Sequence, residues 1–216
     1  MVRNIIFDFD GVILDSMSIR ELGFREILSA YDAEMVEALL RYHEANGGLS
    51  RYDKIAYFYR EIARESLTEK QLQGMAGAFS NIMREKLVDK RYLITQTVDF
   101  LKRHHNRYRL HIASGSDQEE LRYLCTQLGI AEYFLSIYGS PEHKDALVQR
   151  ILSENHYAIE ETILIGDSMN DYAASHVNKI AFYGYNNKAL MKVSRHYLDT
   201  YAILEKEKES KDGTGL

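Results

Sequence analysis

The chain alternates short apolar runs with segments in which apolar residues recur every three or four positions. Five runs are rich in β-branched or aromatic residues, at 2–9, 108–114, 132–139, 162–167 and 179–184. Such continuous apolar runs are typical of parallel strands buried on both faces. Helix-like segments lie between them, at 97–106, 117–129 and 144–156. This order predicts an α/β fold built on a doubly wound parallel sheet.

The interval from about residue 16 to residue 88 breaks this alternation. It holds three long amphipathic patterns and no convincing strand, at 33–45, 51–65 and 69–87. We therefore expect an all-helical cap domain at 16–88, inserted directly after the first strand. The α/β core domain would then comprise residues 1–15 and 89–216. The tail at 205–216 is charged and then contains glycine, so we expect a frayed end.

Composition narrows the class of protein. Apolar residues make up 45% and charged residues 27% of 216 positions, which is ordinary for a globular protein with a core. A net charge of −5 argues against a nucleic-acid partner. Cys125 is the single cysteine, which excludes an intrachain disulfide and a multi-thiolate metal site. Without a signal-peptide pattern or a long apolar run, we expect a cytoplasmic protein with no membrane partner.

Polar residues follow three of the apolar runs at the point where each run ends. Asp8 and Asp10 end the first run in IIFDFDGVILDS, and Ser114 ends the second in IASGS. Asp167 ends the fourth run in IGDSMND and is followed by Asp171. Paired carboxylates beside a buried strand are costly unless a cation or a shared proton compensates them. Because ligands bind outside the carboxyl ends of parallel strands, these residues predict a site at that edge.

The chemistry of the predicted site suits Mg²⁺ and a phosphate group. Mg²⁺ is usually held by one or two carboxylates together with phosphate oxygens, and Asp8 and Asp167 can supply the carboxylates. Asp8 can then attack phosphorus and form an aspartyl-phosphate, while Asp10 protonates the leaving oxygen and later deprotonates water. Lys144 opens a helix whose N-terminus favours a phosphate. Ser114 can donate a hydrogen bond to the same group.

In this order, FDFDGVILDS, the serine of IASGS, the lysine of PEHKDALV and GDSMND resemble the four motifs of the haloacid dehalogenase superfamily. The resemblance spans residues 5–171. It implies Asp8 as the nucleophile and Asp10 as the general acid and base. It also implies that Mg²⁺ is bound by Asp8, Asp167 and the backbone carbonyl of Asp10.

The resemblance extends to supporting residues and to the helical insert. It implies that Ser114 and Lys144 hold the phosphoryl group, and that Asp171 and Gly115 support the surrounding loops. The insert is similar to the small helical cap of phosphoglycolate phosphatases and β-phosphoglucomutases.

Part of the predicted cap, HEANGGLSRYDKI, is similar to a substrate-contacting cap loop of β-phosphoglucomutase-like members. Ser50 and Arg51 are therefore candidate substrate contacts, and an arginine could clamp a second anion or sugar oxygens. The alternative is an ordinary capped helix with Arg51 and Lys54 in solvent.

Departures from the family patterns narrow the reaction. Dehalogenases of the superfamily lack the second aspartate, which is present here as Asp10. β-Phosphoglucomutases carry a histidine where Arg20 stands, and an acidic pair in the fourth motif where this chain has GDSMND. We therefore predict a Mg²⁺-dependent phosphatase acting on a small phosphorylated metabolite, such as a sugar phosphate.

Three alternatives stay open. The first is a phosphosugar mutase. The second is a phosphonatase that would use Lys54 as its cap lysine, and the third is a non-catalytic binding protein on the same fold. Nothing in the sequence distinguishes a sugar phosphate from phosphoglycolate or a nucleotide as the substrate.

Overall fold

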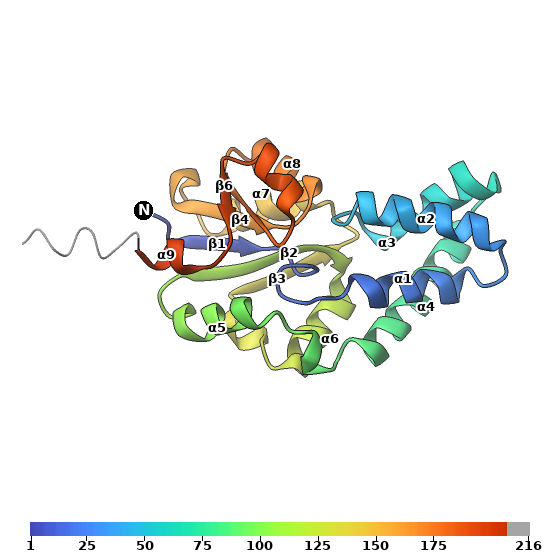
Figure 1. Cartoon of the computed structure of the whole chain (residues 1–216), viewed down its shortest axis with the longest axis horizontal. Helices are drawn as coiled ribbons and strands as arrows, with labels where there is room; N and C mark the ends of the chain where they lie inside the picture. Colours follow the sequence, from blue (N-terminus) through green and yellow to red (C-terminus); the bar gives the residue numbers. More distant parts are fainter. Residues whose placement is uncertain (207–216) are drawn as a thin grey trace, which may run out of the picture.

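A six-stranded, entirely parallel sheet forms the centre of the molecule in the computed structural model, which describes residues 1–206 (Figure 1). The strand order is β3-β2-β1-β4-β5-β6. The strands are β1 (Asn4–Phe7), β2 (Arg109–Asp117), β3 (Ser136–Ser140), β4 (Thr162–Gly166), β5 (Ala181–Tyr185) and β6 (His196–Leu198). The predicted fold class is therefore confirmed. β6 was not predicted, because three residues are too few to show a periodic pattern.

Helices cover both faces of this sheet. α5 and α6 lie on one face, and α7 and α8 lie on the other (Figure 1). The helices of this part are α5 (Thr95–His104), α6 (Gln118–Leu128), α7 (Lys144–Glu154), α8 (Met169–Val177) and α9 (Ala202–Lys206). Short 3₁₀ turns occur at Lys90–Tyr92, Ala131–Tyr133, Ile159–Glu161 and Lys188–Lys192. Asp117 caps α6 and Gly129 ends it at a φ of +73°.

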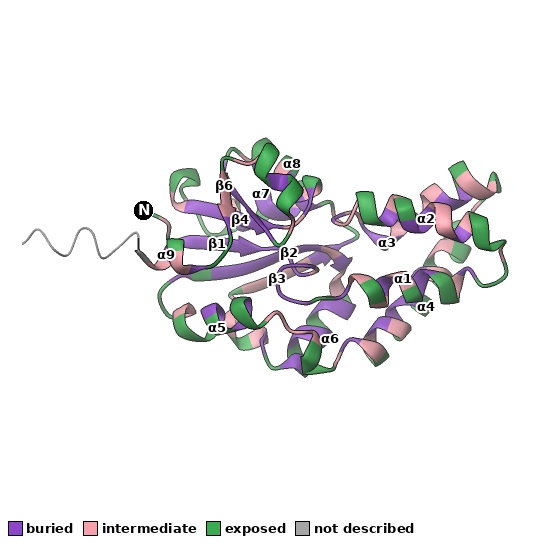
Figure 2. Cartoon of the chain, viewed as in Figure 1, coloured by how far each residue is buried: buried purple, intermediate pink, exposed green. Residues whose placement is uncertain are grey.

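The core is divided between the two faces of the sheet. Ile5 and Phe7 of β1 belong to the larger apolar cluster, whereas Ile6 belongs to the cluster on the opposite face. Successive side chains of a strand point to opposite faces, so one continuous apolar run fills both clusters. Figure 2 shows the buried central strands between half-exposed helices.

Four further helices extend beyond the carboxyl ends of the strands (Figure 1). They are α1 (Met17–Ile27), α2 (Ala33–Ala45), α3 (Arg51–Tyr57) and α4 (Glu69–Lys86), with a π-helical turn at Phe58–Ala63. α1 packs against α4, where the rings of Phe24 and Phe79 lie 4.6 Å apart. No strand occurs between residues 16 and 88, as predicted, although the domain boundaries themselves stay a prediction.

The observed elements differ from the predicted ranges in three places. The helix predicted over 51–65 is α-helical only to Tyr57 and continues as the π-helical turn. The strand predicted from residue 132 begins at Ser136, after a 3₁₀ turn. β2 continues past Ser114 to Asp117, but its regular pairing with β3 is interrupted after Ala113.

Two further predictions meet the limits of the described residues. Of the tail at 205–216, residues 207–216 lie outside the described part of the chain. Across residues 1–206, no helix is both long and apolar enough to cross a membrane.

Candidate active site

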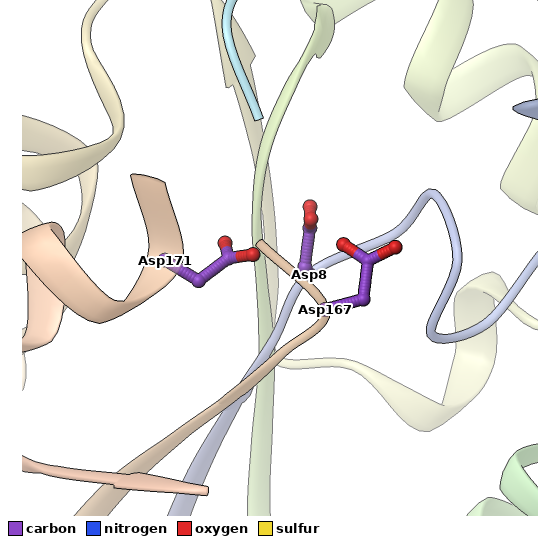
Figure 3. Close-up of side chains that lie close together, drawn as sticks. All are labelled: Asp8, Asp167 and Asp171. Atoms are coloured by element: carbon purple, nitrogen blue, oxygen red, sulfur yellow. The ribbon is translucent and has the colours of Figure 1, made fainter. Parts of the chain in front are cut away.

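Three carboxylates meet at the carboxyl edge of the sheet (Figure 3). Asp8 directly follows β1, Asp167 directly follows β4, and Asp171 lies in the first turn of α8. Oxygen atoms of the three side chains lie within 4.8 Å of one another. Because β1 and β4 are neighbours in the sheet, the residues after them emerge side by side, as the sequence pattern predicts.

Asp171 is fully engaged within the protein. Its Oδ2 accepts hydrogen bonds from the backbone N–H of Ser168 at 3.0 Å and from the Ser168 hydroxyl at 2.6 Å. Its Oδ1 accepts a short hydrogen bond from Nζ of Lys144. The side chain is completely buried. Because both of its oxygens are in use, Asp171 fixes the start of α8 and the orientation of Lys144.

Asp8 and Asp167 carry charge that the surrounding protein compensates only in part. Oδ1 of Asp8 accepts from Nζ of Lys144 at 2.8 Å and from the backbone N–H of Phe9 at 2.7 Å. Asp167 accepts no side-chain hydrogen bond from the described residues. Burial, and then the Asp171 charge, raise the pKa of Asp8 to about 7. Burial, and then the Asp8 charge, raise the pKa of Asp167 to about 8.

These two carboxylates fit a divalent cation. A raised carboxyl pKa means that the negative form is destabilised, and a bound cation removes that penalty. Asp8 Oδ2 and both oxygens of Asp167 are free of protein hydrogen bonds within the described chain. Mg²⁺ prefers one or two carboxylates of this kind, with water or phosphate oxygens completing its shell.

Gly11 lets the chain pass directly beside Asp167. It adopts a φ of +73°, and a Cβ atom built on it would lie 1.9 Å from Oδ2 of Asp167. The turn is closed by the backbone N–H of Gly11 donating to the carbonyl of Leu14 at 2.8 Å. Only glycine accepts this backbone conformation without strain, and only glycine leaves room for the carboxylate.

Asp10 lies in a different environment from Asp8. It accepts hydrogen bonds from Nε of Arg20 at 2.7 Å, from the Ser116 hydroxyl at 2.6 Å and from the Ser16 hydroxyl. Burial alone would raise the pKa of Asp10. The Arg20 charge and the bonds from Ser116 and Ser16 outweigh burial and hold this pKa below its usual value. Asp10 is therefore ionised, whereas Asp8 and Asp167 beside it favour the binding of a proton or a cation.

Lys144 and Ser114 both lie at this edge. Nζ of Lys144 bridges Asp8 and Asp171, and their two charges raise its pKa against the opposing effect of burial. The Ser114 side chain is buried, and its Oγ accepts from the backbone N–H of Ser116 at 3.1 Å. The Ser114 hydroxyl hydrogen is thus available to a ligand.

The helices α1 to α4 and the loops that join them, called the helical segment below, cover this edge through residues 47–49. A Cβ atom built on Gly115 would lie 2.4 Å from the carbonyl oxygen of Gly48. One built on Gly48 would lie 2.8 Å from Oγ of Ser168. Nearby, the Tyr52 hydroxyl donates to Asp117 at 2.9 Å. The carboxyl end of β2 and the loop after β4 therefore both lie against the helical segment.

Ser50 and Arg51, the predicted substrate contacts, have protein partners here. Ser50 caps α3, and its Oγ accepts from the backbone N–H of Asp53 at 3.1 Å. Arg51 is 4% exposed, and its Nη2 lies 2.6 Å from Oε2 of Glu120 in the core. The alternative with Arg51 and Lys54 in solvent is wrong, since both side chains are buried. A substrate contact by Ser50 or Arg51 stays a prediction.

Glu120 and His43 belong to no sequence motif and were not predicted as site residues, and Arg20 was predicted only as a departure from a family pattern. Arg20 also donates to Ser116 at 2.8 Å and to Glu120 at 3.2 Å. Glu120 lies one turn before Leu124, on the buried side of α6. A carboxylate within the apolar stripe of an amphipathic helix signals a buried ion pair, so Glu120 could have been found.

Comparison with known proteins agrees with this geometry. None of the curated proteins matches the chain. Among solved structures, β-phosphoglucomutase from Clostridium difficile is 18% identical with a TM-score of 0.77, covering 97% of this chain and 96% of its own. CbbY from Rhodobacter sphaeroides, solved in complex with phosphate, is 18% identical with a TM-score of 0.74, and the match covers 94% of this chain and 96% of CbbY. A predicted phosphoglycolate phosphatase from Haemophilus somnus is 18% identical with a TM-score of 0.72, and the match covers 95% of this chain and 97% of that protein.

At this level of identity the solved structures establish the fold alone, and the family is established by sequence. The sequence model of the haloacid dehalogenase-like hydrolases matches residues 5–185, which hold the acidic strand ends, Lys144 and the helical segment. The chain belongs to the haloacid dehalogenase-like hydrolase family.

Proposed function

We propose that this protein is a Mg²⁺-dependent phosphomonoester hydrolase that acts on a small phosphorylated metabolite through an aspartyl-phosphate intermediate. The observation that carries the proposal is the pair of Asp8 and Asp167 beside Lys144, under a helical cover. The family match supports it, as does the phosphate bound to the structurally similar CbbY.

Asp8 is the nucleophile in this proposal. Lys144 and the Phe9 N–H both contact its Oδ1, which fixes the orientation of the carboxylate. One carboxylate oxygen of Asp8 forms a bond to phosphorus, and the bond from phosphorus to the ester oxygen breaks. Lys144 and Ser114 stabilise the transferring phosphoryl oxygens. Mg²⁺ bound by Asp8, Asp167 and the Asp10 carbonyl would supply charge neutralisation for the phosphoryl oxygens.

Asp10 transfers the protons. It gives a proton to the leaving oxygen in the first step and takes one from the attacking water in the second, which releases phosphate and restores Asp8. Its contacts with Arg20 and Ser116 favour the ionised form needed for the second step. The first step requires a protonated Asp10, so these contacts must weaken when substrate enters.

Hydrolysis fits the site better than mutase cycling. At the position where β-phosphoglucomutase-like enzymes carry a histidine, Arg20 is committed to Asp10, Ser116 and Glu120. The covering helices limit the access of bulk water during transfer, and their opening would release the products.

The test is phosphate release from a panel of phosphorylated metabolites, with Mg²⁺ and with EDTA. We expect turnover by the native chain with Mg²⁺, none in EDTA, and none in Asp8→Asn. Asp15→Asn is a matched control, because Asp15 is exposed and outside the site. Full activity of Asp8→Asn would disprove the nucleophile. Conversion of one sugar phosphate isomer to another without phosphate release would favour the mutase.

A further inference from the structure

A small cavity lies between the helical segment and the core, next to Asp10. Its free volume in this structure is about 20 Å³, the space of about one water molecule. Asp10 and Ser116 contribute to its core wall, and His43 and Lys54 contribute to its cap wall. Since Asp10 faces the leaving oxygen in the proposed reaction, the group attached to that oxygen would occupy this cavity. Because pockets for drug-sized ligands span roughly 300–1,000 Å³, the group must be small, and the helices that cover the site must move outward to admit it.

The two arginines that line the cavity are already neutralised. Arg20 pairs with Asp10 at 2.7 Å and with Glu120 at 3.2 Å. Arg51 pairs with Glu120 at 2.6 Å, and its guanidinium lies 5.0 Å from the centre of the Phe79 ring. A ligand that recruited either arginine would have to displace a buried carboxylate.

Lys54 has no such partner. It is 3% exposed, and it forms no ion pair with any carboxylate of the described residues. Its Nζ lies 2.8 Å from Nδ1 of His43 and donates to the carbonyl oxygen of Gly47 at 3.2 Å. Both partners are neutral, and one of its three N–H donors remains unused. Burial, and then the Arg20 charge, lower the pKa of Lys54 to about 7, as expected for an ammonium group without a counter-ion.

His43 adds a second donor that lacks a partner. Burial, and then the Lys54 charge, push the pKa of His43 far below its usual value, so the ring is neutral. A neutral ring that accepts from Lys54 at Nδ1 carries its hydrogen on Nε2. Nε2 is buried and has no hydrogen-bond partner in the described chain. The cavity wall therefore holds an uncompensated ammonium and an unpaired N–H, both of which require an acceptor.

We infer that Lys54 and His43 form a subsite for a carboxylate on the leaving group, so that the substrate is the phosphate ester of a small hydroxy acid. The inference rests on the proposed phosphatase function and names its substrate class. A carboxylate offers two acceptor oxygens and the single negative charge that Lys54 lacks. A second phosphate would bring more charge than one ammonium neutralises, and a neutral sugar hydroxyl would leave the ammonium uncompensated.

The experiment compares phosphate esters that differ only in the group facing Lys54. Each pair contains a carboxylate and its hydroxymethyl analogue: phosphoglycolate with 2-hydroxyethyl phosphate, 3-phosphoglycerate with glycerol 3-phosphate, and 6-phosphogluconate with glucitol 6-phosphate. The native chain, Lys54→Met, Lys54→Arg and the control Lys70→Met are assayed with Mg²⁺. Lys70 is an exposed lysine of α4.

We expect the native chain to prefer the acid of at least one pair by roughly 10- to 100-fold in kcat/KM, the effect of one hydrogen bond to a charged group. Lys54→Met should bring this ratio close to one, Lys54→Arg should restore part of it, and Lys70→Met should leave it unchanged. Because the ratio is internal to each variant, partial misfolding does not imitate the effect.

Two further arms separate this inference from the proposed function. Calorimetric titration of the Asp8→Asn variant with each pair measures binding without turnover, and tighter binding of the acid is expected. Hydrolysis of the esters without any preference for the acids, or an unchanged preference in Lys54→Met, would overturn the carboxylate subsite alone. Absence of hydrolysis for every ester, including p-nitrophenyl phosphate, would overturn the proposed function, and the calorimetric preference would still decide the subsite.

Discussion

Replacement of Gly11 by alanine tests the candidate metal site through its backbone. The new Cβ would lie 1.9 Å from Oδ2 and 2.6 Å from Cγ of Asp167, so the carboxylate must move from its present position. The same substitution places a non-glycine residue at a φ of +73°, which costs about 1–2 kcal/mol. These two effects have to be separated experimentally.

Gly129→Ala is the matched control. Gly129 also has a φ of +73°, but the nearest atom to its new Cβ is Nζ of Lys90, at 3.9 Å. It therefore carries the backbone strain without any contact at the candidate site. For a chain of this size, about 1–2 kcal/mol corresponds to a fall in Tm of roughly 2–8 °C. In EDTA, the Tm of Gly129→Ala should fall by this amount. The Tm of Gly11→Ala should fall further, because its new Cβ also displaces Asp167.

The deciding measurement is the rise in Tm on adding Mg²⁺. At a Mg²⁺ concentration of about 100 times Kd, binding stabilises the folded state by about 2.7 kcal/mol, which is roughly 5–11 °C here. We expect this rise in Tm in the native chain and in Gly129→Ala. Gly11→Ala should lose both the rise in Tm and the turnover of substrate. An equal Mg²⁺ shift in all three proteins would refute the inference that Asp167 holds the metal at this position.

Two further predictions concern charge. Glu120→Gln leaves Arg20 and Arg51 without their shared buried carboxylate, and breaking a buried pair costs about 3–5 kcal/mol. Thermal denaturation should show a much larger fall in Tm than in Glu119→Gln, whose side chain is exposed, and equal Tm values would contradict the role of the pair. The second prediction concerns the metal-free protein, in which the raised pKa values of Asp8 and Asp167, about 7 and about 8, add stability at low pH. This stability is lost as the pH rises through those values, so Mg²⁺ should raise Tm more at about pH 8 than at about pH 5.5. A shift independent of pH would speak against these carboxylates as the ligands.

The carboxylate pair could be predicted from sequence because its placement follows from chain direction. An apolar run that fills both faces of the sheet must be a central parallel strand, and the residue after such a strand lies at the carboxyl edge. Asp8 and Asp167 each follow a run of this kind, which is enough to bring them to one edge. The adjacency of β1 and β4 then comes from the fold.

The interaction of the helical segment with the core could not be predicted in the same way. Arg51 and Lys54 lie on one short helix, and both are cationic, so the sequence offers no basis for choosing between them. In the folded chain, Glu120 of α6 forms an ion pair with Arg51, and Lys54 is left without a carboxylate partner among the described residues. Buried ion pairs between distant segments depend on tertiary packing rather than on local periodicity.

This partnership changes which cation can serve a substrate. The sequence resemblance favours Arg51 as the clamp, yet in the folded chain Arg51 and Arg20 share the charge of Glu120, and Arg20 also holds Asp10. Lys54 is left with a neutral imidazole and a carbonyl oxygen as its partners. A buried charge without a counter-ion is costly in the free protein, and the same cost favours a ligand that supplies the missing charge. In this protein the specificity of the cavity therefore depends on the cation that the fold leaves unpaired.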